Sequence, residues 1–204
     1  RGQGGRWSAG DTPDPEGTGP SHPGFMTRGI HDPHEYYYRR LFTDAARAVD
    51  AVRGHPEVDP SRVVVAGGSQ GGAMSLATAA LVPDVAGALI DVPFLSHVSR
   101  AIEITDAEPY VELAYFLGIQ RDQVAAALRT LSYVDVAVLA ARAQAPALFS
   151  VGLFDVTCPP STVYAAYHRY DGPKEIRVYP YNGHEGGQAD HAREQLDWLH
   201  ALLG

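Results

Sequence analysis

The sequence predicts an α/β fold, in which a mostly parallel sheet is flanked by helices. Short apolar runs at 63–66, 87–92 and 146–153 are typical of buried strands, and segments with helical spacing separate them. Strands that alternate with helices imply a parallel sheet. The stretch 93–145 contains no expected strand and is much longer than an ordinary connection, so we expect a helical insert on the sheet that caps a site.

Length, charge and cysteine content limit the possible functions. The 204 residues suit a single domain (1–204) with a sizeable core. The 16 basic and 24 acidic residues give a net charge of −8 without a basic run, which argues against nucleic acid or a membrane surface as partner. The single cysteine, Cys158, excludes an intrachain disulfide and a thiolate metal cluster.

The N-terminal stretch 1–31 is rich in glycine and proline and shows no periodicity, so we expect an ordered loop. Trp7, Phe25 and Met26 are its expected anchors on the body of the protein.

A helix is expected to follow this loop. Asp32 is a good N-cap, and Glu35 three residues later completes a capping-box pattern. Gly54 is expected to end the helix. Its predicted apolar face consists of Leu41, Ala45, Ala48 and Val52.

The C-terminal part is expected to complete the sheet. A helix starts near Pro160, and the alternating stretch 175–179 indicates a half-exposed strand towards the edge of the sheet. The glycine-rich loop 182–187 follows. The last helix has a predicted apolar face of Ala192, Leu196, Leu199 and Leu203.

The motif that indicates chemistry is Gly67-Gly68-Ser69-Gln70-Gly71, directly after the first predicted strand and before a run of helix formers. A G-x-S-x-G motif in this context holds the serine hydroxyl on a strained turn above the sheet, and its glycines allow close backbone approach. The first N–H groups of the helix, above all that of Gln70, can bind a developing oxyanion. A serine that merely caps the helix is the plainer interpretation. The agreement of motif with strand and helix favours a nucleophile.

A serine nucleophile needs a histidine base. His184 is the one histidine in a glycine-rich loop directly after a late strand, at the carboxyl end of the sheet where open α/β folds build their sites. The other histidines fall in predicted helices, turns, the N-terminal loop or the insert: His22, His31, His34, His55, His97, His168, His191 and His200.

The acid that orients the base should lie between Ser69 and His184 in the chain. Two aspartates end predicted strands there, Asp91 and Asp155. Asp155 is favoured because it leaves its strand at the apolar end and is followed by a turn. Asp91 stays open as the alternative.

Several segments together resemble one family, the acetyl xylan esterase and cephalosporin C deacetylase family of carbohydrate esterases (family 7, α/β-hydrolase superfamily). The segments are RGQGG at 1–5, HPGFMTRGI at 22–30, YYYRR at 36–40, GGSQGG at 67–72, CPPST at 158–162 and YNGHEGG at 181–187. The resemblance spans practically the whole chain.

This resemblance implies that Ser69 is the nucleophile, Asp155 the acid and His184 the base, with the Gln70 N–H as one oxyanion donor. It implies a serine esterase that removes acetyl groups from small acetylated sugars and cephalosporin C. No cofactor or metal is expected. The expected assembly is a homohexamer with active sites that face an internal cavity, and the default expectation for its location is the cytoplasm.

The resemblance also implies that Arg1 and Gln3 help to support the site. In that family the RGQ motif follows an N-terminal portion that carries the early strands of the sheet, so we expect those strands to be missing from this chain. The strand around 63–66 would then lose a neighbour, and the second oxyanion donor would lie before Arg1. We therefore expect these 204 residues alone to be a poor catalyst and a poor fold.

Two other classes of function stay open from the sequence. A peptidase of the same fold would carry the same motif and the same order of triad residues. A non-catalytic binding module related to hydrolases is the second, although it has little reason to keep all three residues.

Overall fold

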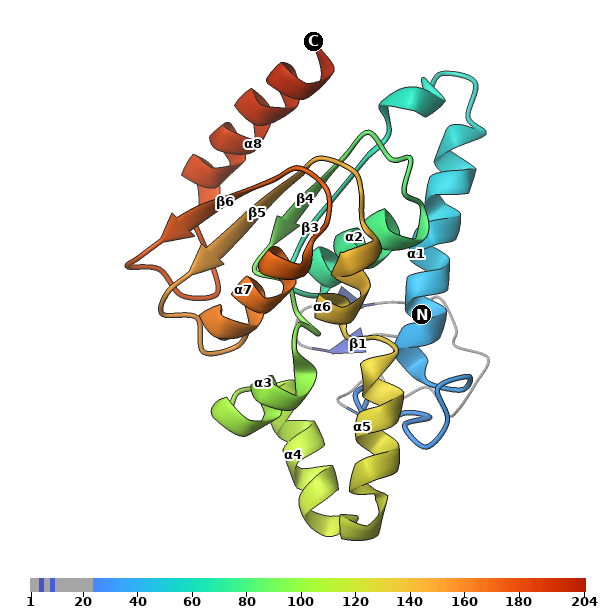
Figure 1. The fold of residues 1–204 in the computed structure, drawn as a ribbon, viewed down its shortest axis with the longest axis vertical. Helices are drawn as coiled ribbons and strands as arrows, with labels where there is room; N and C mark the ends of the chain where they lie inside the picture. The colour runs from blue at the N-terminus through green and yellow to red at the C-terminus, as the bar shows by residue number, and fades with distance from the viewer. Residues whose placement is uncertain (1–3, 6–7, 10–23) are drawn as a thin grey trace.

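The fold is built on a four-stranded parallel sheet in the order β3-β4-β5-β6 (Figure 1). The structure is a computed structural model that describes residues 4–5, 8–9 and 24–204. Its strands are β1 (Gly4–Gly5), β2 (Ser8–Ala9), β3 (Val64–Gly68), β4 (Gly87–Asp91), β5 (Ala147–Gly152) and β6 (Lys174–Tyr179). Its α-helices are α1 (Tyr37–Arg53), α2 (Gln70–Leu81), α3 (Val98–Ile104), α4 (Tyr110–Ile119), α5 (Val124–Ser132), α6 (Val136–Leu139), α7 (Pro160–Arg169) and α8 (Gln188–Leu203). Short 3-10 helices span Pro60–Arg62, Arg121–Gln123 and Ala140–Arg142.

The four predicted strands correspond to β3, β4, β5 and β6, with bounds that shift by no more than two residues. The prediction of a parallel α/β sheet is therefore confirmed. β6 lies at one edge, as its alternating pattern predicted. Among the described strands β3 pairs only with β4, so β3 forms the opposite edge. Figure 1 shows α8 on one side of the sheet and α1, α2, α6 and α7 on the other.

The start of α1 differs from the prediction. The Asp32 carboxylate accepts a hydrogen bond from the His34 N–H at 2.8 Å and so shapes a turn, whereas α1 begins only at Tyr37 after Tyr36 in extended conformation. Since Asp32 closes its own local turn, it is not the helix cap. The end of α1 at Gly54 agrees with the prediction.

The buried side of α1 also differs from the predicted one. The buried residues of the helix are Tyr37, Tyr38, Phe42 and Val49. Of the predicted face, Leu41 and Ala45 are half-buried, and Ala48 and Val52 are exposed. Aromatic side chains remove more apolar area from water than alanines, which explains why the aromatic stripe faces the core.

The last helix, α8, packs on the sheet through a stripe that sequence periodicity did not select. His191 is its buried residue, and Trp198 and Leu202 lie against Gly87 of β4. The predicted apolar face is partly in solvent, with Leu196 56% exposed. The predicted face of α8 is therefore wrong, because the sheet side of this helix holds a polar cluster that Asp91 anchors.

The stretch 93–145 contains helices and no strand, as predicted, and Figure 1 shows α3, α4 and α5 extending beyond the carboxyl ends of the strands. Asp135 joins the two ends of this insert, the start of α3 and the start of α6. Its carboxylate accepts hydrogen bonds from the backbone N–H groups of His97, Val98 and Ala137 at 2.8 to 2.9 Å. Burial raises the pKa of this carboxyl group.

The N-terminal stretch is only partly within the described residues. Its predicted anchors Phe25 and Met26 are buried, with exposures of 9% and 1%. Trp7 lies outside the described residues. The short antiparallel pair β1–β2 falls inside the stretch that was expected to be loop throughout.

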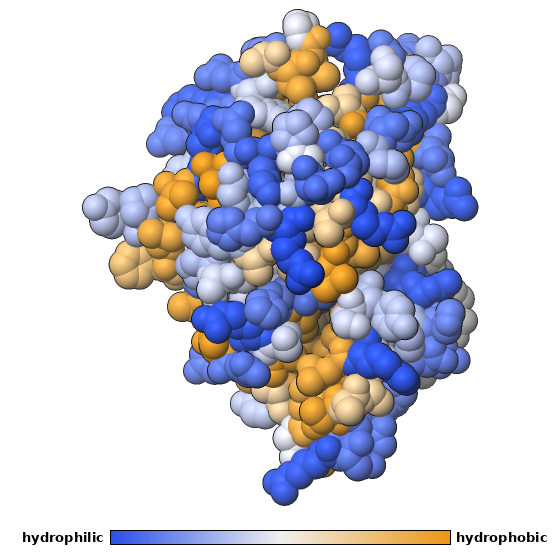
Figure 2. All heavy atoms as spheres, in the orientation of Figure 1, coloured by the Kyte–Doolittle hydropathy of each residue, from blue (hydrophilic) through white to orange (hydrophobic). Residues whose placement is uncertain are grey.

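Among the described residues no single helix is long and apolar enough to cross a bilayer; the bent pair Arg121–Ser132 and Val136–Arg142 meets the length and composition criteria only when both are taken together. Figure 2 shows apolar surface between polar side chains over the insert. In α4 of this insert, Tyr115 and Ile119 are 70% and 78% exposed.

Candidate active site

Ser69 occupies a sharp turn between β3 and α2. Its backbone has φ 56° and ψ −116°, a strained conformation for a residue with a side chain. The Ser69 N–H donates to the carbonyl of Asp91 at 2.9 Å, and the Ser69 carbonyl accepts from the N–H groups of Ala73 and Phe94 at 3.0 Å. The surrounding backbone thus holds the serine in place.

Two glycines make this turn possible. A Cβ on Gly67 would lie 2.5 Å from the backbone of Gly71, and a Cβ on Gly72 would lie 2.5 Å from the carbonyl oxygen of Asp91. Both distances are too short for any side chain. A Cβ on Gly71 would meet no described atom within 4 Å. It is therefore the backbone of Gly71, and not its missing side chain, that leaves no room for a side chain at Gly67.

His184 lies in the loop between β6 and α8, and its ring lies between Ser69 and Asp155. The Nε2 atom is 2.8 Å from the Ser69 Oγ, and the Nδ1 atom is 2.8 Å from the Asp155 Oδ2. A carboxylate only accepts hydrogen bonds, so Nδ1 carries the proton and Nε2 is left to accept from the serine hydroxyl. This is the arrangement in which a histidine can take a proton from serine.

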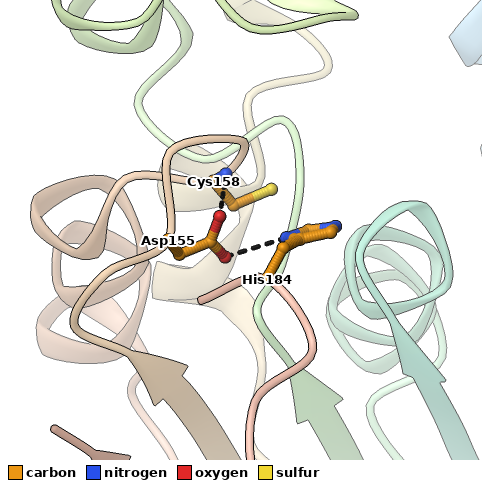
Figure 3. Close-up of side chains that lie close together, drawn as sticks. All are labelled: Asp155, Cys158 and His184. Carbon is orange, nitrogen blue, oxygen red and sulfur yellow. Dashed lines mark hydrogen bonds and ion pairs between the residues drawn. The ribbon is translucent and has the colours of Figure 1, made fainter. Parts of the chain in front are cut away.

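Asp155 is buried and firmly oriented, with a residue exposure of 3%. Its Oδ1 accepts from the backbone N–H groups of Thr157 and Cys158, both at 2.8 Å. Figure 3 shows its carboxylate between the Cys158 backbone and the His184 ring. One carboxylate oxygen therefore fixes the side chain and the other faces the histidine.

The loop that carries His184 is stabilised on both sides of the residue. The Glu185 carboxylate accepts from the Gly183 N–H at 3.1 Å and from the Asn182 side chain at 3.0 Å. Hydrogen bonds from its own backbone N–H, from Asn182 and from Gly183 lower the pKa of Glu185. The Phe154 N–H donates to the Asn182 carbonyl at 2.9 Å, which joins this loop to the Asp155 turn.

Asp91, the alternative acid, is bonded elsewhere. Its Oδ1 accepts from His191 Nε2 at 2.7 Å and from the Ser150 hydroxyl at 3.0 Å, and its Oδ2 accepts from the Gln195 amide at 2.7 Å. Of the two candidates, Asp155 is the one next to His184. Sequence reasoning missed the pairing of Asp91 with His191, and the signal that could have indicated it is the pair of polar residues His191 and Gln195 on the inner side of α8.

Of the remaining predicted site residues, the structure describes only Gln70. Gln70 is the first residue of α2, directly after Ser69, so its N–H lies at the helix N-terminus as predicted. Its side-chain oxygen accepts from the Tyr38 hydroxyl at 3.3 Å, a contact that the sequence did not suggest. Arg1 and Gln3 lie outside the described residues.

A metal ion could find ligands only at the same place, among the described residues. One ligand atom each of Asp155, Cys158 and His184 lie within 4.8 Å of one another (Figure 3). Both Asp155 and the His184 Nδ1 are already engaged with each other. Burial raises the pKa of the Cys158 thiol and so disfavours the thiolate that binds metals. The cluster fits a hydrogen-bonded triad better than a metal site.

The known proteins that this chain resembles include two acetyl xylan esterases and one acetyl esterase. An acetyl xylan esterase from Paenibacillus sp. R4 is 42% identical, with a TM-score of 0.89 over 94% of this chain and 62% of that one. Acetyl xylan esterase 1 from Thermoanaerobacterium sp. JW/SL YS485 is 35% identical, with a TM-score of 0.89 over 98% of this chain and 64% of that one. Acetyl esterase Axe7A of Xylanibacter ruminicola is 33% identical over 161 residues, which are 79% of this chain and 36% of that protein.

The chain thus spans less than two thirds of the length of these relatives. The fold they share with it is that of the α/β-hydrolases, as the sequence predicted. The family model described as acetyl xylan esterase (AXE1) matches residues 1–202. The chain belongs to the acetyl xylan esterase (AXE1) family.

Proposed function

We propose that the protein is a serine esterase that hydrolyses acetyl esters of small acetylated carbohydrates through Ser69, His184 and Asp155. The observation that carries the proposal is the position of the His184 ring, with 2.8 Å to Ser69 Oγ on one side and 2.8 Å to Asp155 Oδ2 on the other. Hydrogen-bond reach between nucleophile, base and orienting acid is the geometric requirement for acyl transfer.

The reaction proceeds in two halves. His184 Nε2 takes the proton of the Ser69 hydroxyl while Oγ attacks the acetyl carbonyl carbon. The tetrahedral intermediate collapses, and the protonated His184 gives its proton to the departing sugar oxygen. Water then attacks the acetyl-serine with His184 again as base, and acetate and free Ser69 are released. Asp155 stays ionised throughout and stabilises the positive charge on His184.

The negative charge on the intermediate requires hydrogen-bond donors. The N–H of the residue after the nucleophile supplies one in turns of this kind, which here is Gln70. The hydrogen bond between Tyr38 and the Gln70 side chain fixes the start of α2 and so supports this role. We assign supporting roles to Arg1 and Gln3 on the family resemblance alone.

The substrate class rests on the relatives, whose names give acetyl xylan and acetyl esters as their substrates. Acetylated xylooligosaccharides are the proposed substrates of this protein. The family resemblance adds two finer proposals, which are deacetylation of cephalosporin C and assembly into a homohexamer.

The test compares variants of the full-length protein on p-nitrophenyl acetate, acetylated xylooligosaccharides and cephalosporin C. Ser69→Ala and His184→Ala should each lose nearly all turnover while the melting temperature stays close to that of the wild type. Ser99→Ala, at an exposed serine of α3, is the matched control and should keep full activity. Cleavage of peptides without cleavage of acetyl esters would favour a peptidase. A wild-type protein that a fluorophosphonate probe does not label would refute the proposed nucleophile.

A further inference from the structure

A second carboxylate–histidine pair lies beside the proposed triad and is not used by it. His191 of α8 places Nε2 2.7 Å from the Asp91 carboxylate and Nδ1 2.8 Å from the Tyr179 hydroxyl. Ser150 and Gln195 donate to the same carboxylate. His191 is 5% exposed, and its partners Tyr179 and Asp91 are half-buried.

The two hydrogen bonds of His191 in this network each have a defined direction. The Asp91 carboxylate only accepts, so the proton on the imidazole sits at Nε2 of His191, and Nδ1 accepts from the Tyr179 hydroxyl. Desolvation, together with the nearby carboxylates of Glu194 and Asp91, raises the pKa of Tyr179, which keeps this phenol protonated as a donor. The Tyr179 hydroxyl therefore donates to His191, and His191 donates to Asp91.

The two ends of the loop that carries His184 meet in this network. Tyr179 is the last residue of β6, and His191 lies in the first turn of α8, so the hydrogen bond between them closes the loop 180–187 at its base. The Tyr179 ring also packs directly under the loop: a Cβ on Gly187 would lie 2.1 Å from the Tyr179 Cζ. The position of the loop thus depends on the position of this ring.

The other end of the network reaches the nucleophile. The backbone carbonyl of Asp91, whose side chain binds His191, accepts the N–H of Ser69 at 2.9 Å. One residue therefore joins the turn of the nucleophile to the loop of the base. We propose that Tyr179, His191 and Asp91 are positioning residues that set the distance between the Ser69 Oγ and the His184 Nε2.

This inference rests on the proposed esterase function, because it assigns these residues a role in that reaction. None of the three touches the reacting atoms, and they act through the backbone of the two catalytic segments. Misplacement of a catalytic group by about 1 Å can cost about 100-fold in rate. We therefore expect kcat to fall, with little change in KM, when a hydrogen bond between Tyr179, His191 and Asp91 is removed.

The central variant is Tyr179→Phe in the full-length protein, because it removes the hydroxyl and keeps the ring that packs under Gly187. We expect kcat on p-nitrophenyl acetate to fall about 10- to 100-fold, with KM within about twofold of the wild type. The rate of labelling by a fluorophosphonate should fall in parallel, since it also depends on the alignment of Ser69 and His184. Tyr181→Phe is the matched control, because Tyr181 lies in the same loop and is 88% exposed.

A second pair of variants separates positioning from stability. His191→Gln keeps a side-chain N–H that can donate to Asp91 and should retain more activity than His191→Leu. If the network were only structural, the variants would melt at lower temperature while kcat measured well below melting stayed at the wild-type value. That result would overturn the inference.

The outcomes also separate this inference from the proposed function. A wild type that does not hydrolyse acetyl esters would overturn both. An active wild type, with Tyr179→Phe equally active and equally fast in labelling, would overturn the positioning role alone.

Discussion

Replacement of Asp155 by asparagine tests how the acid acts on the base. The Asp155 Oδ1 accepts two backbone N–H groups, and an asparagine can place its carbonyl oxygen there and keep both bonds. Its amide N–H group then faces the His184 Nδ1 in place of the accepting Oδ2. The imidazole must move its proton to Nε2, where it can no longer accept the proton of Ser69.

The expected loss follows from this change of tautomer. A serine triad with an asparagine in place of its aspartate loses about 10⁴-fold in kcat, which corresponds to about 5 kcal/mol of transition-state stabilisation. The loss should appear in kcat on p-nitrophenyl acetate, while circular dichroism and melting temperature stay close to those of the wild type, because both backbone bonds are kept.

Asp91→Asn is the comparison for this experiment, because Asp91 also ends a strand and binds a histidine. It should cost no more than about 100-fold, since its effect reaches the reaction only through the position of the two catalytic segments. An Asp155→Asn variant that keeps more than a tenth of the wild-type kcat would refute the assignment of the acid. A larger loss in Asp91→Asn than in Asp155→Asn would contradict the reasoning in the same way.

Two further predictions concern the turn and the assembly. Gly67→Ala should lower the free energy of unfolding by about 1–3 kcal/mol or more and reduce activity, because its Cβ would lie 2.5 Å from the Gly71 backbone. Gly71→Ala, whose Cβ meets no described atom within 4 Å, should be tolerated in a urea titration, and equal losses in both variants would contradict the packing argument. For the assembly, light scattering of the full-length protein should give a hexamer, and a monomer would count against the family-based proposal.

The strands and the nucleophile turn could be predicted because each depends on local sequence. Continuous β-branched and apolar runs have few alternatives to a buried parallel strand. The turn at Ser69 needs glycine at Gly67 and Gly72, where the structure leaves no room for a Cβ. Local chemistry of this kind is visible in one segment without knowledge of its neighbours.

The faces of the helices could not be predicted to the same extent. In α1 two stripes are apolar, and the sequence alone does not say which one faces the core. In α8 the inner side holds His191 and Gln195, which are polar, so a search for apolar periodicity selects the wrong side. Tertiary contacts with Asp91 decide the rotation of this helix, and such contacts are not a local property of the sequence.

The two aspartates show why the sequence left the choice of acid open, and the structure places only Asp155 next to His184. Asp91 and Asp155 follow the same local rule, since each stands where a parallel strand meets the carboxyl edge of the sheet. Their roles diverge through the histidine that each one meets: His184 lies on a loop that reaches Ser69, and His191 lies on a helix packed against the sheet. A histidine on that helix keeps a carboxylate satisfied and fixes the loop, whereas a histidine on the loop can present its second nitrogen to the nucleophile. The division between positioning and catalysis therefore follows from the element that carries each histidine.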